Sequence, residues 1–177
     1  MIRGRPQMDF EPQFKRDILV SIRPFYAAKI LAGQKRVELR RKFPIETVTG
    51  AMVLIYSSSP VSAVVGFARI KNVLRLPVAK IWREHGPAAC VSKKEFDAYF
   101  SGLEYGFAIF LERIESLRRR LNAGDLQEGF GIVPPQSYRY LTQECTALLK
   151  NERVQASRRH KHHNRARRSS ARSKVAR

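Results

Sequence analysis

Apolar and polar positions alternate along the chain in a way that predicts short strands and helices. Strands are expected at residues 17–22, 35–42, 51–56, 61–76 and 105–115, and helices at residues 24–32, 78–85, 93–100 and 136–150. Residues 117–135 contain several glycines and a Pro-Pro pair, and are predicted to be a polar connection. The resulting order, β-α-β-β-β-α-α-β-α, indicates an α+β fold built on a small barrel or curled sheet.

The first helix and the strand after it show the sharpest change of pattern. Glycine readily adopts the left-handed conformation that ends a helix, so Gly33 is the predicted helix stop. In the following strand, Val37 and Leu39 are expected to turn into the barrel, and Glu38 and Arg40 to share the opposite face. Lys35 is out of phase with that charged pair, and joins it only if the chain is still turning after the glycine.

The net charge indicates a protein that binds a polyanion rather than one that serves only as a scaffold. The 177 residues carry a formal charge of +19, of which +9 falls after residue 150. Residues 1–16 are predicted to be a flexible arm, residues 17–150 the folded domain, and residues 151–177 a disordered basic tail. The predicted phosphate contacts of that tail are Arg158, Arg159, Lys161, Arg165, Arg167 and Arg168.

Several other classes of protein are not expected. No apolar run approaches the roughly 18 residues that a membrane-spanning helix requires, and the start of the chain lacks a secretory signal pattern, so a cytoplasmic protein without a membrane partner is predicted. Cys90 and Cys145 have no CxxC partner, and the three histidines of the tail lack a fixed geometry. We therefore predict neither a metal site nor a cofactor.

One stretch resembles a known family. Residues 21–44, SIRPFYAAKILAGQKRVELRRKFP, are similar to the opening of the ASCH domain, whose signature G-x-K-x-x-E-x-R corresponds here to Gly33, Lys35, Glu38 and Arg40. The agreement continues through LIYSSSPVSAVVGFARI, IWREHG and SKKEFDAYFSGLEYGFAIFL to PPQSYRYL, which ends at Leu141. The resemblance implies a PUA-like small β-barrel with flanking helices. It also implies a cleft beside the first helix, lined by the signature residues, that receives RNA or a modified nucleotide.

The side chains around the signature suit that role. An arginine fork grips a phosphate or a base edge with two hydrogen bonds, and a carboxylate accepts from a base amino group. The predicted ligand-binding residues are Arg23, Lys35, Glu38, Arg40, Tyr56, Ser57, Ser58 and Tyr138. Plainer alternatives stay open: Glu38 and Arg40 can form a purely structural ion pair, and Tyr138 and Tyr140 can be packing residues.

An enzymatic reading is also open. Small ASCH proteins that hydrolyse N4-acetylcytidine have a threonine nucleophile at the position of Glu38, and their further catalytic glutamate falls near Ala88 and Ala89. A carboxylate does not replace an activated hydroxyl. We therefore predict an RNA-binding regulatory domain, with RNA, a modified nucleotide or DNA as partner. The alternatives are a nucleic-acid-processing hydrolase or nuclease centred on Lys35, Glu38 and Arg40, and an interaction module of a transcription or translation assembly.

Overall fold

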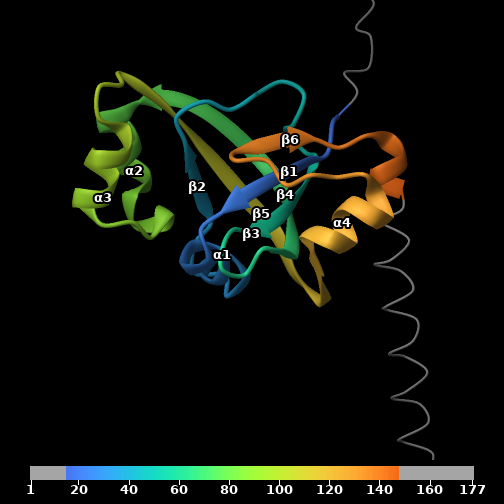
Figure 1. Cartoon of the computed structure of the whole chain (residues 1–177). Coiled ribbons are helices and arrows are strands. Elements are labelled where there is room, and N and C mark those ends of the chain that lie inside the picture. Colours follow the sequence, from blue (N-terminus) through green and yellow to red (C-terminus); the bar gives the residue numbers. More distant parts are fainter. Residues whose placement is uncertain (1–14, 148–177) are drawn as a thin grey trace, which may run out of the picture.

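Six strands form one curled sheet, in the order β2-β5-β4-β3-β1-β6 (Figure 1). The computed structural model describes residues 15–147. The elements are β1 (Ile18–Ile22), α1 (Pro24–Leu31), β2 (Val37–Arg40), β3 (Met52–Ser57), β4 (Ala63–Pro77), α2 (Val78–Ala89), α3 (Lys93–Phe100), β5 (Tyr105–Asn122), α4 (Ala123–Phe130) and β6 (Tyr138–Tyr140). The sequence predicted an α+β fold with a small barrel or curled sheet and flanking helices, and the curled sheet and the helices are confirmed.

Strand pairing separates the two strands that α1 connects. β1 pairs in parallel with β3, and all other neighbouring strands of the sheet are antiparallel. β2 lies at the far edge of the sheet, where it pairs only with β5. The chain therefore leaves β1, which lies next to the edge strand β6, forms α1, and continues into β2 at the opposite edge, so that α1 lies beside the gap between β1 and β2 (Figure 1).

The central strands are buried on both faces, which explains their nearly continuous apolar sequences. Ile18, Val20 and Ile22 of β1 enter the main core inside the curled sheet. Leu19 of the same strand faces the opposite way and joins a second cluster with Leu126 of α4. A strand with apolar side chains on both faces cannot slip by one residue without moving a different set of side chains into each cluster.

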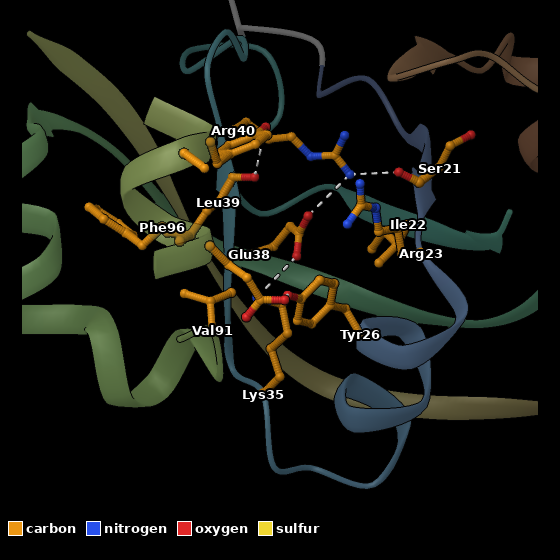
Figure 2. Close-up of a pocket in the computed structure, with 13 residues that line it drawn as sticks. Ser21, Ile22, Arg23, Tyr26, Lys35, Glu38, Leu39, Arg40, Val91 and Phe96 are labelled. Carbon is orange, nitrogen blue, oxygen red and sulfur yellow. Dashed lines mark hydrogen bonds and ion pairs between the residues drawn. The ribbon is translucent and has the colours of Figure 1, made fainter. Parts of the chain in front are cut away.

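The apolar face of β2 corrects one expectation from the sequence. Val37 and Leu39 were expected inside the barrel, but they pack in a third cluster with Ile81 of α2 and Phe96 of α3. The hydrophobic partner of β2 is therefore the pair of helices that follows β4. As a result, the opposite, charged face of β2 looks across the gap toward β1 and α1 (Figure 2).

The C-terminal part of the domain differs most from the prediction. Residues 117–135 are not a simple connection, because β5 continues to Asn122 and α4 follows it. The predicted helix at 136–150 is wrong in its first part, where β6 pairs with β1; helical residues begin at 143. Asn122 and Asp125 form a capping box that starts α4, and the fully buried Leu126 anchors it. Packing thus outweighs the low helix propensity of its glycines.

Other local predictions are confirmed. Gly33 and Gly102 both have the positive φ expected of residues that follow a helix, 73° and 74°. The S-x-x-E spacing of Ser92 and Glu95 in the sequence predicts a capping box, and these two residues form one at the start of α3. Within residues 15–147, no helix is long and apolar enough to cross a membrane. The predicted arm, up to residue 14, and the predicted basic tail lie outside the described residues.

Candidate functional site

A cleft of about 480 Å³ opens between β1 and α1 on one side and β2 and α3 on the other (Figure 2). Its polar lining comes from Ser21, Arg23, Tyr26, Lys35, Glu38, Arg40, Glu95 and Tyr99, and its apolar lining includes Leu39, Val91 and Phe96. The charged floor of the cleft is formed by Lys35, Glu38 and Arg40, which we call the ion-pair floor.

The turn after α1 places Lys35 within reach of Glu38. The backbone N–H groups of Gln34 and Lys35 both donate to the Lys29 carbonyl, at 3.0 Å. The chain is therefore still turning at Lys35, and β2 begins only at Val37. This is the condition under which the sequence allowed Lys35 to converge with the charged face of the strand.

The Lys35 ammonium group is buried and fully used by the protein. The residue is only 1% exposed. Its Nζ donates to the Ala89 carbonyl at 2.6 Å and the Val37 carbonyl at 2.8 Å, and lies 3.3 Å from Glu38 Oε2. An ammonium group has three N–H donors, so these three acceptors satisfy it. Lys35 therefore holds α2 to β2 and positions Glu38, with no donor left for a ligand.

Arg40 connects β2 to β1 across the cleft. Its Nη2 lies 3.1 Å from Glu38 Oε1 and donates to the Ser21 carbonyl at 2.8 Å, while Nη1 donates to Ser137 Oγ at 3.4 Å. Its Nε is buried and has no hydrogen-bond partner among the described residues. Glu38 is thus held between two cations, with one carboxylate oxygen toward each, and the Nε–H donor of the arginine is unused by the described residues.

A second carboxylate lies at the rim of the cleft. The Tyr26 hydroxyl of α1 donates to Glu95 Oε1 of α3 at 3.0 Å. Hydrogen bonds from the Ser92 side chain and backbone lower the pKa of Glu95, with a further contribution from Tyr26. Burial and the bond to Glu95 raise the pKa of Tyr26, and burial raises the pKa of Tyr99. At neutral pH the rim therefore carries one carboxylate and two protonated tyrosines.

The structure brings together half of the residues that the sequence predicted as ligand-binding. Arg23, at the N-cap of α1, lines the cleft with the three residues of the ion-pair floor. Tyr56, Ser57, Ser58 and Tyr138 are not among the residues that line it. Tyr56 belongs to the apolar cluster beneath α4, and the Tyr138 ring packs edge-on against Phe43 at 5.2 Å. Tyr138 therefore packs against the main core.

Four polar residues of the cleft were missed in the sequence: Ser21, Tyr26, Glu95 and Tyr99. Glu95 was recognised there only as the capping residue of α3. Its second role depends on the close approach of α3 to α1, because its partner Tyr26 lies 69 positions earlier in the chain. The periodicity of a single helix cannot reveal such a contact.

Metal ligation finds no support in residues 15–147, where no group of three or more His, Cys, Asp or Glu side chains could hold an ion. The six basic tail residues predicted to contact phosphates lie outside the described residues. What the described cleft offers chemically is a charged, hydrogen-bonding floor beneath aromatic and aliphatic walls.

Comparison with known proteins identifies clear relatives, although no family model matches the chain. The ASCH domain-containing ribonuclease of Zymomonas mobilis is 33% identical over 136 residues, which are 76% of this chain and 90% of that protein. A crystal structure of ASCH from Zymomonas mobilis superposes with a TM-score of 0.72 at 32% identity, covering 76% of this chain and 94% of that one. The large ribosomal subunit protein uL22 of Ureaplasma parvum is 30% identical over 132 residues, which are 74% of this chain and 41% of that protein.

Proposed function

This chain belongs to the ASCH domain family, and from that premise and the geometry of its cleft we propose that it binds RNA on the ion-pair floor. The observation that carries the proposal is the Nε–H of Arg40, a buried donor that has no hydrogen-bond partner among the described residues although Nη1 and Nη2 of the same side chain are bound. Leaving such a donor unpaired costs about 1–3 kcal/mol. A phosphate oxygen or a base carbonyl that enters the cleft would supply the missing acceptor.

Each residue of the floor has a separate part in this proposal. Arg40 donates to the ligand, and Lys35 fixes the orientation of Glu38 from below. Each Glu38 oxygen faces one cation and keeps further acceptor capacity for a base amino group. Arg23, exposed at the mouth of the cleft, attracts a phosphate.

The net charge of the chain and its similarity to a ribonuclease favour RNA over other anionic ligands. The net charge of +19 suits a polyanion, and the relative from Zymomonas mobilis is named a ribonuclease. Phosphate contacts by Arg158, Arg159, Lys161, Arg165, Arg167 and Arg168 of the tail, and a regulatory role for the complex, are parts of the same proposal.

Binding of a fluorescent RNA tests the proposal. We expect Arg40→Lys, which keeps the charge but removes Nε–H and the planar fork, to weaken binding by about 5- to 150-fold. Glu38→Gln should weaken discrimination between base sequences more than overall affinity. Arg83→Gln is the matched control, because Arg83 is an exposed arginine of α2 that does not line the cleft. If Arg40→Lys and Arg83→Gln bind RNA as tightly as the wild type, the cleft is not the binding site.

RNA cleavage is a second candidate function, favoured by one specific observation. Crystal structures of the Zymomonas mobilis protein include variants with one tyrosine changed to phenylalanine or one serine changed to alanine. Those two positions are separated by the same number of residues as Tyr56 and Ser137 here. Ser137 Oγ accepts from Arg40, and Tyr56 is in register with Ser21 of the cleft. Ser137 therefore contacts the floor, and Tyr56 lies on the strand beside Ser21; neither residue lines the cleft.

Such a reaction would use the ribose of the substrate itself. The 2′-oxygen forms a bond to phosphorus, the bond from phosphorus to the 5′-oxygen breaks, and the proton lost by the 2′-hydroxyl is balanced by one gained at the 5′-oxygen. Arg40 and Arg23 would stabilise the charge that develops on the phosphate. Lys35 is a poor candidate for base or nucleophile, because all three of its donors are bound. For the same reason we expect no hydrolysis of N4-acetylcytidine.

Product analysis by mass spectrometry tests the second candidate. Cleavage should yield 2′,3′-cyclic phosphate ends, should disappear on 2′-O-methylated RNA, and should fall in Ser137→Ala and Tyr56→Phe while binding of the methylated RNA persists. If unmodified RNA stays intact with a protein that binds it, the protein is a binder and the cleavage hypothesis is wrong.

A further inference from the structure

An aromatic ring on the outer side of α1 is largely exposed to solvent, so packing in the core does not explain its presence. Phe25 is 61% exposed, more than any other large apolar side chain among the described residues. Single exposed apolar residues are common on protein surfaces. Among residues 15–147, however, the two exposed large aromatic residues, Phe25 and Tyr99, come from the two helices that wall the cleft. This placement points to a ligand that continues beyond the cleft.

The ring of Phe25 is held by its neighbours. It lies 5.3 Å from the ring of Tyr26 at an interplanar angle of 70°, an edge-to-face contact, and Tyr26 lines the cleft. The Nζ of Lys29, one turn later on the helix, lies 4.3 Å from the centroid of the Phe25 ring. The Phe25 side chain is therefore oriented before any ligand arrives, and it adjoins the wall of the cleft.

The charges around the ring fit one class of ligand. Arg23 precedes Phe25 at the mouth of the cleft, and Lys29 follows it on the same helix. An aromatic ring with cations nearby is an arrangement that binds single-stranded nucleic acid, because bases stack on rings and phosphates pair with cations. The Lys29 ammonium group lies over one face of the Phe25 ring, which leaves the other face for a base. An apolar patch on a protein partner would have to pack against Arg23 and Lys29 here, so a protein is the less favoured ligand.

We propose that Phe25, Arg23 and Lys29 form a subsite for the nucleotide next to the one in the cleft, with its base stacked on Phe25 and its phosphates near the two cations. The inference rests on the proposed RNA binding and goes beyond it, because it places a second nucleotide and specifies single-stranded RNA. It requires that the RNA is single-stranded both in the cleft and at Phe25, on either side of Tyr26.

A ladder of 2′-O-methylated oligoadenylates with one, two, three and six nucleotides tests the subsite. Wild-type protein should bind the dinucleotide more tightly than the mononucleotide. Phe25→Ala and Phe25→Leu should weaken binding of two or more nucleotides by about 5- to 150-fold and leave the mononucleotide unaffected. Phe25→Trp should restore or strengthen binding, because it restores the flat face. Lys29→Gln should lower the salt slope by roughly one for the longer oligomers.

Matched controls separate the possible failures. Val133→Ala removes an equally exposed apolar side chain that does not line the cleft, and should change nothing. If Arg40→Lys weakens binding while Phe25→Ala matches Val133→Ala, the subsite is wrong and the cleft proposal stands. If Phe25→Ala weakens the mononucleotide as much as the dinucleotide, the ring acts through the cleft and the subsite is again wrong. If the wild type binds no oligomer, the proposed function itself fails.

Discussion

Replacing Lys35 by methionine would test whether the ion-pair floor stabilises the fold as well as the site. Methionine keeps an unbranched side chain of similar length but has no donor. The carbonyl groups of Ala89 and Val37 would lose their 2.6 Å and 2.8 Å partners, and Glu38 would keep only Arg40. The side chain of Lys35 is 2% exposed and that of Glu38 is 12% exposed, so water cannot readily replace the lost bonds.

The expected size of the effect follows from these contacts. Each buried acceptor left without a partner costs about 1–3 kcal/mol, and breaking a buried ion pair by removing one member costs about 3–5 kcal/mol. We therefore expect Lys35→Met to lower the free energy of unfolding by roughly 3–5 kcal/mol, a large part of the 5–15 kcal/mol typical of a domain. Urea denaturation followed by circular dichroism measures this difference directly.

An exposed ion pair on α3 provides the control. Lys93 and Asp97 form an i,i+4 pair whose side chains are 54% and 55% exposed. Lys93→Met should change the free energy of unfolding by no more than about 0.5 kcal/mol. If Lys35→Met is destabilised by less than about 1 kcal/mol, the lysine does not hold the floor together and our assignment of its role is wrong.

Three further predictions concern the surroundings of the cleft. Val37→Asp would place an unpaired carboxylate between β2 and the α2/α3 pair, and should abolish the cooperative unfolding transition because such burial costs several kcal/mol. Gly66→Ala would bring a Cβ to 2.5 Å from the carbonyl of Glu115, and a loss of about 1–3 kcal/mol in urea denaturation is expected; an unchanged midpoint would contradict the close approach of β4 and β5. The lowered pKa of Glu95 stabilises the fold above its ordinary value of 4.5, and this contribution disappears as the pH falls through the folded-state pKa. The difference in melting temperature between wild type and Glu95→Gln should therefore be present at pH 6 and shrink toward pH 3, and a constant difference would be the contrary result.

Local signals in the sequence were sufficient for the elements around the cleft. The switch from a helical to an alternating pattern at Gly33, and the Ser92–Glu95 capping box, are properties of a few neighbouring residues, and both are confirmed. The same alternation correctly placed Glu38 opposite Val37 on β2. It could not say which side of the sheet was inside, because that depends on where α2 and α3 pack.

What the sequence could not predict depends on contacts between distant segments. α4 contains two glycines, and its helix is stabilised by Leu126 in a cluster shared with β1 and β3. The bond between Tyr26 and Glu95 joins two helices that only the crossover of α1 brings together. Saturation of the Lys35 donors likewise involves the carbonyl of Ala89, more than 50 residues away along the chain. Only these long-range contacts distinguish a lysine that positions Glu38 from a lysine that binds a ligand.

The side-chain N–H of Arg40 offers the most direct test of the proposed function. In two-dimensional NMR spectra of ¹⁵N-labelled protein, the Nε–H signal of Arg40 can be assigned by its absence in Arg40→Lys. If the cleft binds RNA through this donor, titration with a 2′-O-methylated oligonucleotide should shift the signal downfield and slow its exchange with water, while the signal of Arg83 stays in place. An Arg40 signal that is unchanged when the protein is saturated with RNA would contradict binding on the ion-pair floor.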